Sequence, residues 1–77
     1  MREIMEDKEE LIKQLQWVKY RIQILDMIEE RLLIMRQLAV EAFENDLSKA
    51  EREEIGRQIQ KLQQEIMLLE MENTKEQ

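Results

Sequence analysis

The sequence predicts an all-α fold, an antiparallel hairpin of two helices, and three observations support this prediction. Proline is absent and glycine occurs once among the 77 residues, so little in the sequence interrupts long helices. Apolar residues recur at helical spacing in two runs. A short polar segment separates the runs. We therefore predict one domain, 1–77, with a long helix at about 3–44 and a shorter helix at about 48–73.

Composition and charge narrow the classes of function. Charged residues make up 39% of the chain and hydrophobic residues 43%, a mixture typical of long helices and coiled coils. The chain contains neither cysteine nor histidine, so we expect no disulfide, no metal, no cofactor and no catalysis. The net charge of −6 argues against binding to nucleic acid. No run approaches the ~18–20 apolar residues of a membrane span, and the acidic N-terminal segment is untypical of a signal peptide.

The first predicted helix carries one long apolar stripe. Between residues 11 and 42 its apolar positions follow steps of three or four residues, the spacing of one helix face. The N-terminal part is predicted to be an interface with a partner, formed by Leu11, Leu15, Trp17, Val18 and Ile22. Trp17 is its expected anchor, because large aromatic side chains dominate such contacts. The C-terminal part is predicted to pack inside the hairpin through Leu25, Ile28, Leu32, Met35 and Ala39.

The turn and the second helix follow from local signals. Asn45 and Asp46 favour a turn, because their side chains compete for nearby backbone groups. The next residues read S-K-A-E, which predicts a capping box between Ser48 and Glu51. Antiparallel pairing about Leu47 then sets the first helix against the stripe of the second. The predicted core residues of the second helix are Ile55, Ile59, Leu62, Ile66 and Leu69.

The two predicted helices differ greatly in length. Roughly 20 residues of the first helix, ~30 Å, project beyond the second, and their apolar stripe has no cover within the hairpin. An uncovered stripe of this kind indicates a partner. We predict a homodimer or higher homo-oligomer, most simply an antiparallel dimer that forms a coiled-coil-like four-helix bundle, or a complex with another helical protein.

Residues from about 24 to 69 resemble a known family. The segment contains M-R-Q-L-A-V-E-A at residues 35–42, a short loop, and then L-S-K-A-E-R at residues 47–52. These blocks and their spacing are similar to the helical hairpin near the N-terminal side of the outer-core domain of bacterial flagellins. Leu33 and Ile34 stand where flagellins usually have Gln-Arg. In flagellins this hairpin packs with a returning C-terminal helix.

The resemblance implies a non-enzymatic interaction module that self-associates or binds flagellar components through its apolar helix faces. It implies a bacterial protein of the cytoplasm or, after export without a cleaved signal, of the flagellum or the medium. The similarity does not extend to the terminal segments with which flagellins polymerise, so we expect no filament from this chain alone. The alternative is a small cytoplasmic helical regulator or adaptor unrelated to motility.

Overall fold

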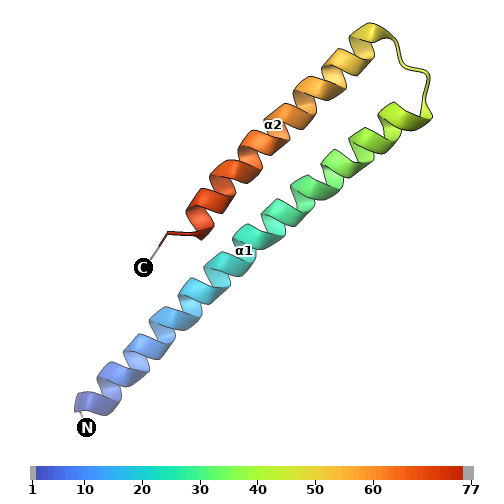
Figure 1. Ribbon diagram of the computed structural model, residues 1–77. Helices are drawn as coiled ribbons and strands as arrows, with labels where there is room; N and C mark the ends of the chain where they lie inside the picture. The colour runs from blue at the N-terminus through green and yellow to red at the C-terminus, as the bar shows by residue number, and fades with distance from the viewer. Residues whose placement is uncertain (1, 76–77) are drawn as a thin grey trace.

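A computed structural model describes residues 2–75, with side chains from residue 7 onward. Two helices make up the structure, α1 at Arg2–Glu44 and α2 at Lys49–Asn73. They run antiparallel and lie side by side (Figure 1). No strand occurs between residues 2 and 75. The all-α hairpin predicted from the sequence is confirmed.

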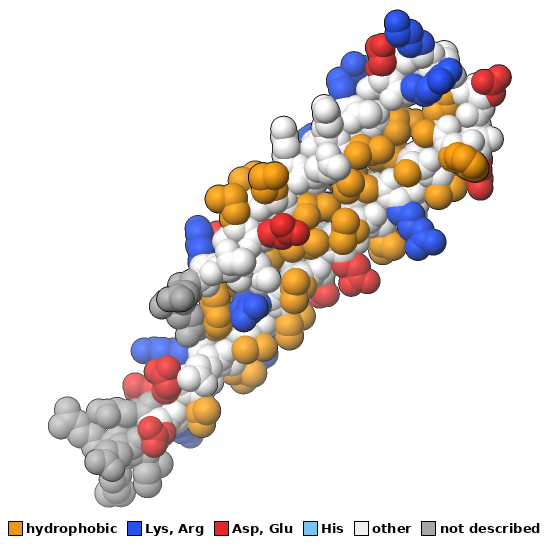
Figure 2. Space-filling view, viewed as in Figure 1, with side chains coloured by type: hydrophobic (Ala, Val, Ile, Leu, Met, Phe, Trp, Pro, Cys, Tyr) orange, Lys and Arg blue, Asp and Glu red, His pale blue; other side chains and the backbone are white. Residues whose placement is uncertain are grey.

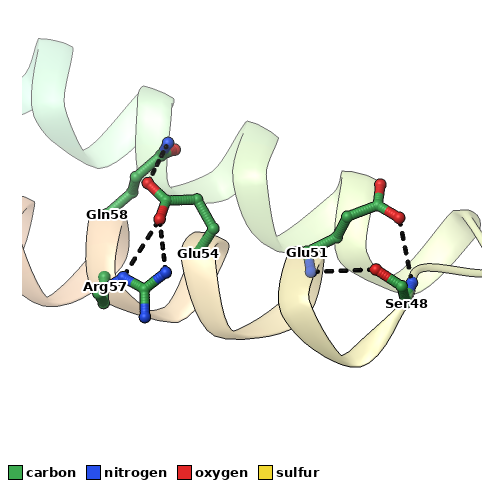
Figure 3. A network of polar contacts seen from close by, with 5 residues as sticks. All are labelled: Ser48, Glu51, Glu54, Arg57 and Gln58. Atoms are coloured by element: carbon green, nitrogen blue, oxygen red, sulfur yellow. Dashed lines mark hydrogen bonds and ion pairs between the residues drawn. The ribbon is translucent and has the colours of Figure 1, made fainter.

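The turn at residues 45–48 is held by polar contacts at both helix ends. The backbone N–H and the side-chain Nδ2 of Asn45 both donate to the carbonyl oxygen of Glu41, at 3.1 and 2.9 Å. At the start of α2, Ser48 Oγ accepts the N–H of Glu51 and Glu51 Oε1 accepts the N–H of Ser48, each at 3.2 Å (Figure 3). This reciprocal pair is the predicted capping box, and it satisfies two backbone donors that the helix leaves unpaired.

Two polar contacts mark the register between the helices. Nε of Arg31 donates to Oε2 of Glu65 at 3.2 Å, and Nε of Arg21 donates to Oδ1 of Asn73 at 3.5 Å, where α2 ends. In both contacts the two residues lie at nearly equal sequence distances before and after Leu47, as antiparallel pairing about this residue requires.

The seam between the helices has a small core. Within residues 7–75 only Ile24 and Ile66 are buried hydrophobic residues, with 3% and 9% of their surface exposed. The structure places all five predicted core residues of α2 in this seam. Ile66 is buried, and half-buried residues accompany it at Ile55, Ile59, Leu62 and Leu69. A core of this size leaves an isolated hairpin marginally stable.

On α1 the seam uses a face rotated away from the predicted one. Its residues follow steps of four and three, and they are Ile24, Ile28, Arg31, Met35, Leu38 and Ala42. Ile28 and Met35 belong to both the predicted and the observed set. Three predicted core residues are wrong: Leu25 and Leu32 are 50% and 51% exposed, and Ala39 is also exposed.

The rotation of α1 has a physical reason in the side chains that α2 meets. The observed face offers α2 a leucine at Leu38 in place of the small Ala39, and it brings Arg31 to Glu65. Apolar residues stand on both alternative faces, so α2 covers one of them and leaves the other exposed.

Beyond the end of α2, α1 continues alone (Figure 1). α1 has 43 residues and α2 has 25, and the difference corresponds to ~27 Å of helix. The molecule measures 70 × 17 × 10 Å. No described segment of the chain lies beside α1 on the N-terminal side of about residue 20. We call this part of α1 the overhang.

Candidate interaction surface

Six large apolar side chains form an exposed line along α1, which we call the outer stripe. They are separated by four, three, four, three and seven residues, so they share one helix face. Between 48% and 64% of the surface of each residue is exposed. The outer stripe consists of Leu11, Leu15, Val18, Ile22, Leu25 and Leu32. Figure 2 shows hydrophobic side chains along the overhang as well as between the two helices.

The outer stripe lies beside the hairpin seam and not within it. Successive residues on a helix are turned by about 100°, so Leu25 on the outer stripe faces roughly a quarter-turn away from Ile24 in the seam. A single helix packed on Ile24 cannot also cover Leu25. The outer stripe therefore stays exposed alongside α2 and continues onto the overhang without changing face.

The predicted interface residues divide between two faces. Four of them, Leu11, Leu15, Val18 and Ile22, belong to the outer stripe. Trp17 does not, because it lies seven residues before Ile24 and so occupies the seam face just past the end of α2.

Trp17 packs on Tyr20 at the open end of the hairpin. It is half-buried, and its ring centroid lies 5.8 Å from that of Tyr20, with the ring planes tilted by 33°. Tyr20 Oη in turn donates to the carboxylate of Glu72 at 2.7 Å. Sequence reasoning missed the contact between Tyr20 and Glu72, because it followed the neighbouring apolar face of α1 and the two residues are 52 positions apart.

Glu72 is the centre of a small charged group at this end. Its carboxylate pairs with Nζ of Lys75 at 2.8 Å. Hydrogen bonds from Lys75 and then from Tyr20 lower the pKa of Glu72. The same hydrogen bonds to Glu72 raise the pKa of Tyr20 and of Lys75. The ionised form of Glu72 is thus the form that holds Tyr20 to α2.

Sequence reasoning also missed the ion pair in the seam. The side chains of Arg31 and Glu65 are 24% and 37% exposed, and Arg31 Nη1 additionally donates to the carbonyl oxygen of Met27 at 3.1 Å. Arg31 lies among apolar residues of the seam face, and a search that follows apolar positions alone does not detect it. The signal that could have found the pair is the predicted register, which sets Glu65 close to the level of Arg31.

The described part of the surface includes two open depressions. One lies near the turn and is lined by Leu33, Arg36, Gln37, Val40, Glu41, Glu44 and Asn45. The other lies between the helices and is lined by Ile34, Leu38, Gln58, Lys61, Leu62 and Glu65. Among the described residues no three acidic side chains gather to hold a metal ion. Both depressions set apolar side chains beside charged ones.

No helix in the described part of the chain is long and apolar enough to cross a membrane.

The exposed surface is large for the mass of the chain. It amounts to 6927 Å² for 9.5 kDa, whereas a globular monomer of that mass exposes about 5,000 Å². Comparisons with protein-family models, with curated proteins and with solved structures found no match for this chain.

Proposed function

We propose that this protein is a non-enzymatic helical interaction module that pairs its outer stripe with another apolar helix face, in a flagellin-related setting. The outer stripe carries the proposal. Its six large apolar residues lie on one face, each about half exposed, on a helix whose neighbouring face α2 already occupies. A contiguous exposed apolar surface of this kind marks an interaction site.

Burial of the outer stripe supplies a substantial binding energy. Full burial of a Leu, Ile or Val side chain contributes ~1.5–3 kcal/mol. Because each of the six residues is already about half covered, their burial contributes on the order of 5–9 kcal/mol before the costs of association. The partner thereby also stabilises a hairpin that has two buried residues of its own among those described.

The polar side chains support a role in binding and folding. Catalysis by a nucleophile requires a base within hydrogen-bond reach. The charged side chains that pair with each other here join a cation to a carboxylate, at 2.7 to 3.2 Å, and not a nucleophile to a base. The pairs are Arg31–Glu65, Arg57–Glu54 and Lys75–Glu72. Such pairs orient and stabilise helices, which is what an interaction module requires of them.

The flagellin-related setting is supported by the resemblance over residues 24–69. The block M-R-Q-L-A-V-E-A occupies part of α1 near the turn, and S-K-A-E-R forms the capped start of α2. Both blocks therefore lie at the closed end of the hairpin. The proposed partners are a second copy of this chain, flagellar components that present an apolar helix face, or both.

Calorimetric titration tests this function. The protein is titrated separately with flagellin, with the flagellin export chaperone and with other flagellar assembly factors. At least one is expected to bind at micromolar concentrations. Binding should disappear in Ile22→Asp, on the outer stripe, and persist in the matched control Gln23→Asp, an exposed neighbour on another face.

If none of these proteins binds at tens of micromolar, and deletion of the gene leaves motility and filament length unchanged, the flagellin-related setting is wrong. Equal loss of binding in Ile22→Asp and Gln23→Asp would instead show that the outer stripe is not the binding surface.

A further inference from the structure

We infer that the outer stripe pairs with the outer stripe of a second copy of this chain, with the two α1 helices antiparallel and Lys19 of each copy beside Asp26 of the other. This inference rests on the proposed function, because it names the partner of the same surface.

The partner must be long and must carry the same spacing. Leu11 and Leu32 are 21 residues apart, which corresponds to ~32 Å of helix. α1 is itself a helix of that length with that spacing. The chain also exposes about 1,900 Å² more than a globular monomer of its mass, on the order of the area that one subunit buries in an obligate homodimer.

The direction follows from the charges that continue the line of the stripe. Glu29 and Arg36 lie seven and fourteen residues after Ile22, on the same helix line. In a parallel, in-register pair each would meet its own copy inside the seam, and burying like charges against each other is costly.

A parallel pair would also place the two turn regions side by side. Residues 41–54 contain six acidic and two basic side chains, so two such regions repel each other. An antiparallel pair removes both conflicts, because it separates the turns by most of the length of α1 and opposes the two helix dipoles.

The register follows from charges on one flank of the outer stripe. Lys19 and Asp26 directly follow Val18 and Leu25, so they lie on the same flank. Both are exposed, and neither forms an ion pair with another described residue. In an antiparallel pair this flank faces the same flank of the other helix. If Ile22 is level with Leu25 of the second copy, Lys19 lies beside Asp26 twice, once on each side of the two-fold axis.

Neighbouring registers are disfavoured by like charges. A shift of one heptad in one direction brings Lys19 against Lys19 and Arg21 against Arg21 at the two-fold axis. A shift in the other direction brings Asp26 against Asp26. Opposed like charges disfavour a pairing and so select against it.

The favoured register also covers the overhangs. It sets Leu15 against Leu32 of the second copy and nearly aligns the ends of the two α1 helices. Each overhang then lies along the hairpin half of the other copy, with the two α2 helices at opposite ends. Glu29 and Arg36 each face an apolar residue of the other copy, and their long stems let the charged groups reach water.

Disulfide cross-linking tests the direction and the register together. The chain has no cysteine, so cysteines in the double variant Leu15→Cys/Leu32→Cys are unique. They are 17 residues apart, ~26 Å along one helix, and cannot join within one chain. Oxidation is expected to give a covalent dimer. Trypsin should then release segment 14–19 joined to segment 32–36, because cleavage follows Lys13, Lys19, Arg31 and Arg36.

The control variant Gln16→Cys/Leu33→Cys moves both cysteines one residue off the outer stripe and should not give the corresponding dimer. Segments joined to their own copies, 14–19 to 14–19 and 32–36 to 32–36, would show a parallel pair and overturn the inference. So would the absence of a covalent dimer in a sample whose circular dichroism is helical.

Charge reversal provides a test that leaves the apolar surface intact. Lys19→Asp and Asp26→Lys should each weaken association by roughly tenfold, because each opposes like charges at two symmetric sites. The double variant should restore it. Failure of the double variant to restore association would overturn the register.

The two proposals fail separately. Without a cross-link, stripe-dependent binding of a flagellar protein would leave the proposed function standing and remove the second copy as partner. A cross-link without any flagellar partner would retain the dimer and remove the flagellin-related setting.

Discussion

Nε of Arg31 on α1 donates to Oε2 of Glu65 on α2 at 3.2 Å, in the middle of the hairpin seam. Arg31 stands between Ile28 and Met35 along the seam, so its aliphatic stem packs where an apolar residue would otherwise stand. This ion pair therefore links the rotation of α1 about its axis to its register against α2.

Substitution of Arg31 should separate the packing of its stem from its charge. Arg31→Ala is expected to destabilise the hairpin by about 1 kcal/mol, because it removes the ion pair and leaves a gap. Arg31→Met keeps the volume and should change stability by less, because an apolar side chain suits the seam. Urea unfolding at one fixed protein concentration measures both. Equal destabilisation by the two variants would contradict this assignment.

The capping box gives a local prediction. Ser48→Ala removes the acceptor for the N–H of Glu51 and should cost about 1 kcal/mol. Ser48→Asp retains an acceptor at the same place and should preserve most of the stability. Thermal unfolding followed by circular dichroism distinguishes them. A Ser48→Asp variant as unstable as Ser48→Ala would show that the hydroxyl is not acting as a cap.

Gly56 offers a stabilising substitution. A Cβ atom built at this residue has no neighbour within 4 Å, so a methyl group fits without any rearrangement. Gly56→Ala should stabilise the protein by about 0.5–1 kcal/mol, because alanine has the higher helix propensity. Gln60→Ala, one turn further along α2, is the control and should change little. Destabilisation by Gly56→Ala would indicate that a partner packs against this residue in the assembled protein.

The pH dependence at the open end of the hairpin follows from Glu72. Hydrogen bonds from Lys75 and then Tyr20 lower its pKa in the folded state. Its contribution to stability is therefore complete above the ordinary glutamate pKa of about 4.3 and is lost as the pH falls through the lowered folded-state pKa.

Tyr20→Phe removes one of these hydrogen bonds, so the pKa of Glu72 should rise toward its ordinary value and stay partly lowered by Lys75. NMR titration of the side-chain carboxyl carbons measures the shift. Glu54 is the internal control, because hydrogen bonds from Arg57 and Gln58 lower its pKa independently of Tyr20 (Figure 3). An unchanged pKa for Glu72 in this variant would show that the contact with Tyr20 is absent in solution.

The ends of the helices were predictable because their chemistry is local. At the end of α1 the Asn45 side chain donates to the carbonyl oxygen of Glu41, four residues earlier. At the start of α2, Ser48 and Glu51, three residues apart, form the capping box. The antiparallel register was also predictable, because a short turn leaves little freedom in how the helices pair.

The face of α1 in the seam was not predictable in the same way. Ile24 and Leu25 are both apolar, as are Leu38 and Ala39, so spacing alone does not decide which of each pair meets α2. The decision depends on contacts across the hairpin, such as Arg31 with Glu65, between residues 34 apart in sequence. The outer stripe was consequently recognised along the overhang and missed at Leu25 and Leu32, alongside α2.

Sedimentation equilibrium over a range of protein concentrations tests directly whether this hairpin associates through its outer stripe. The chain is expected to sediment at twice the 9.5 kDa of a single copy. Ile22→Asp should return it to one copy, and Gln23→Asp should leave the dimer unchanged. A mass of one copy at every concentration, in a protein with a helical circular dichroism spectrum, would contradict self-association through this surface.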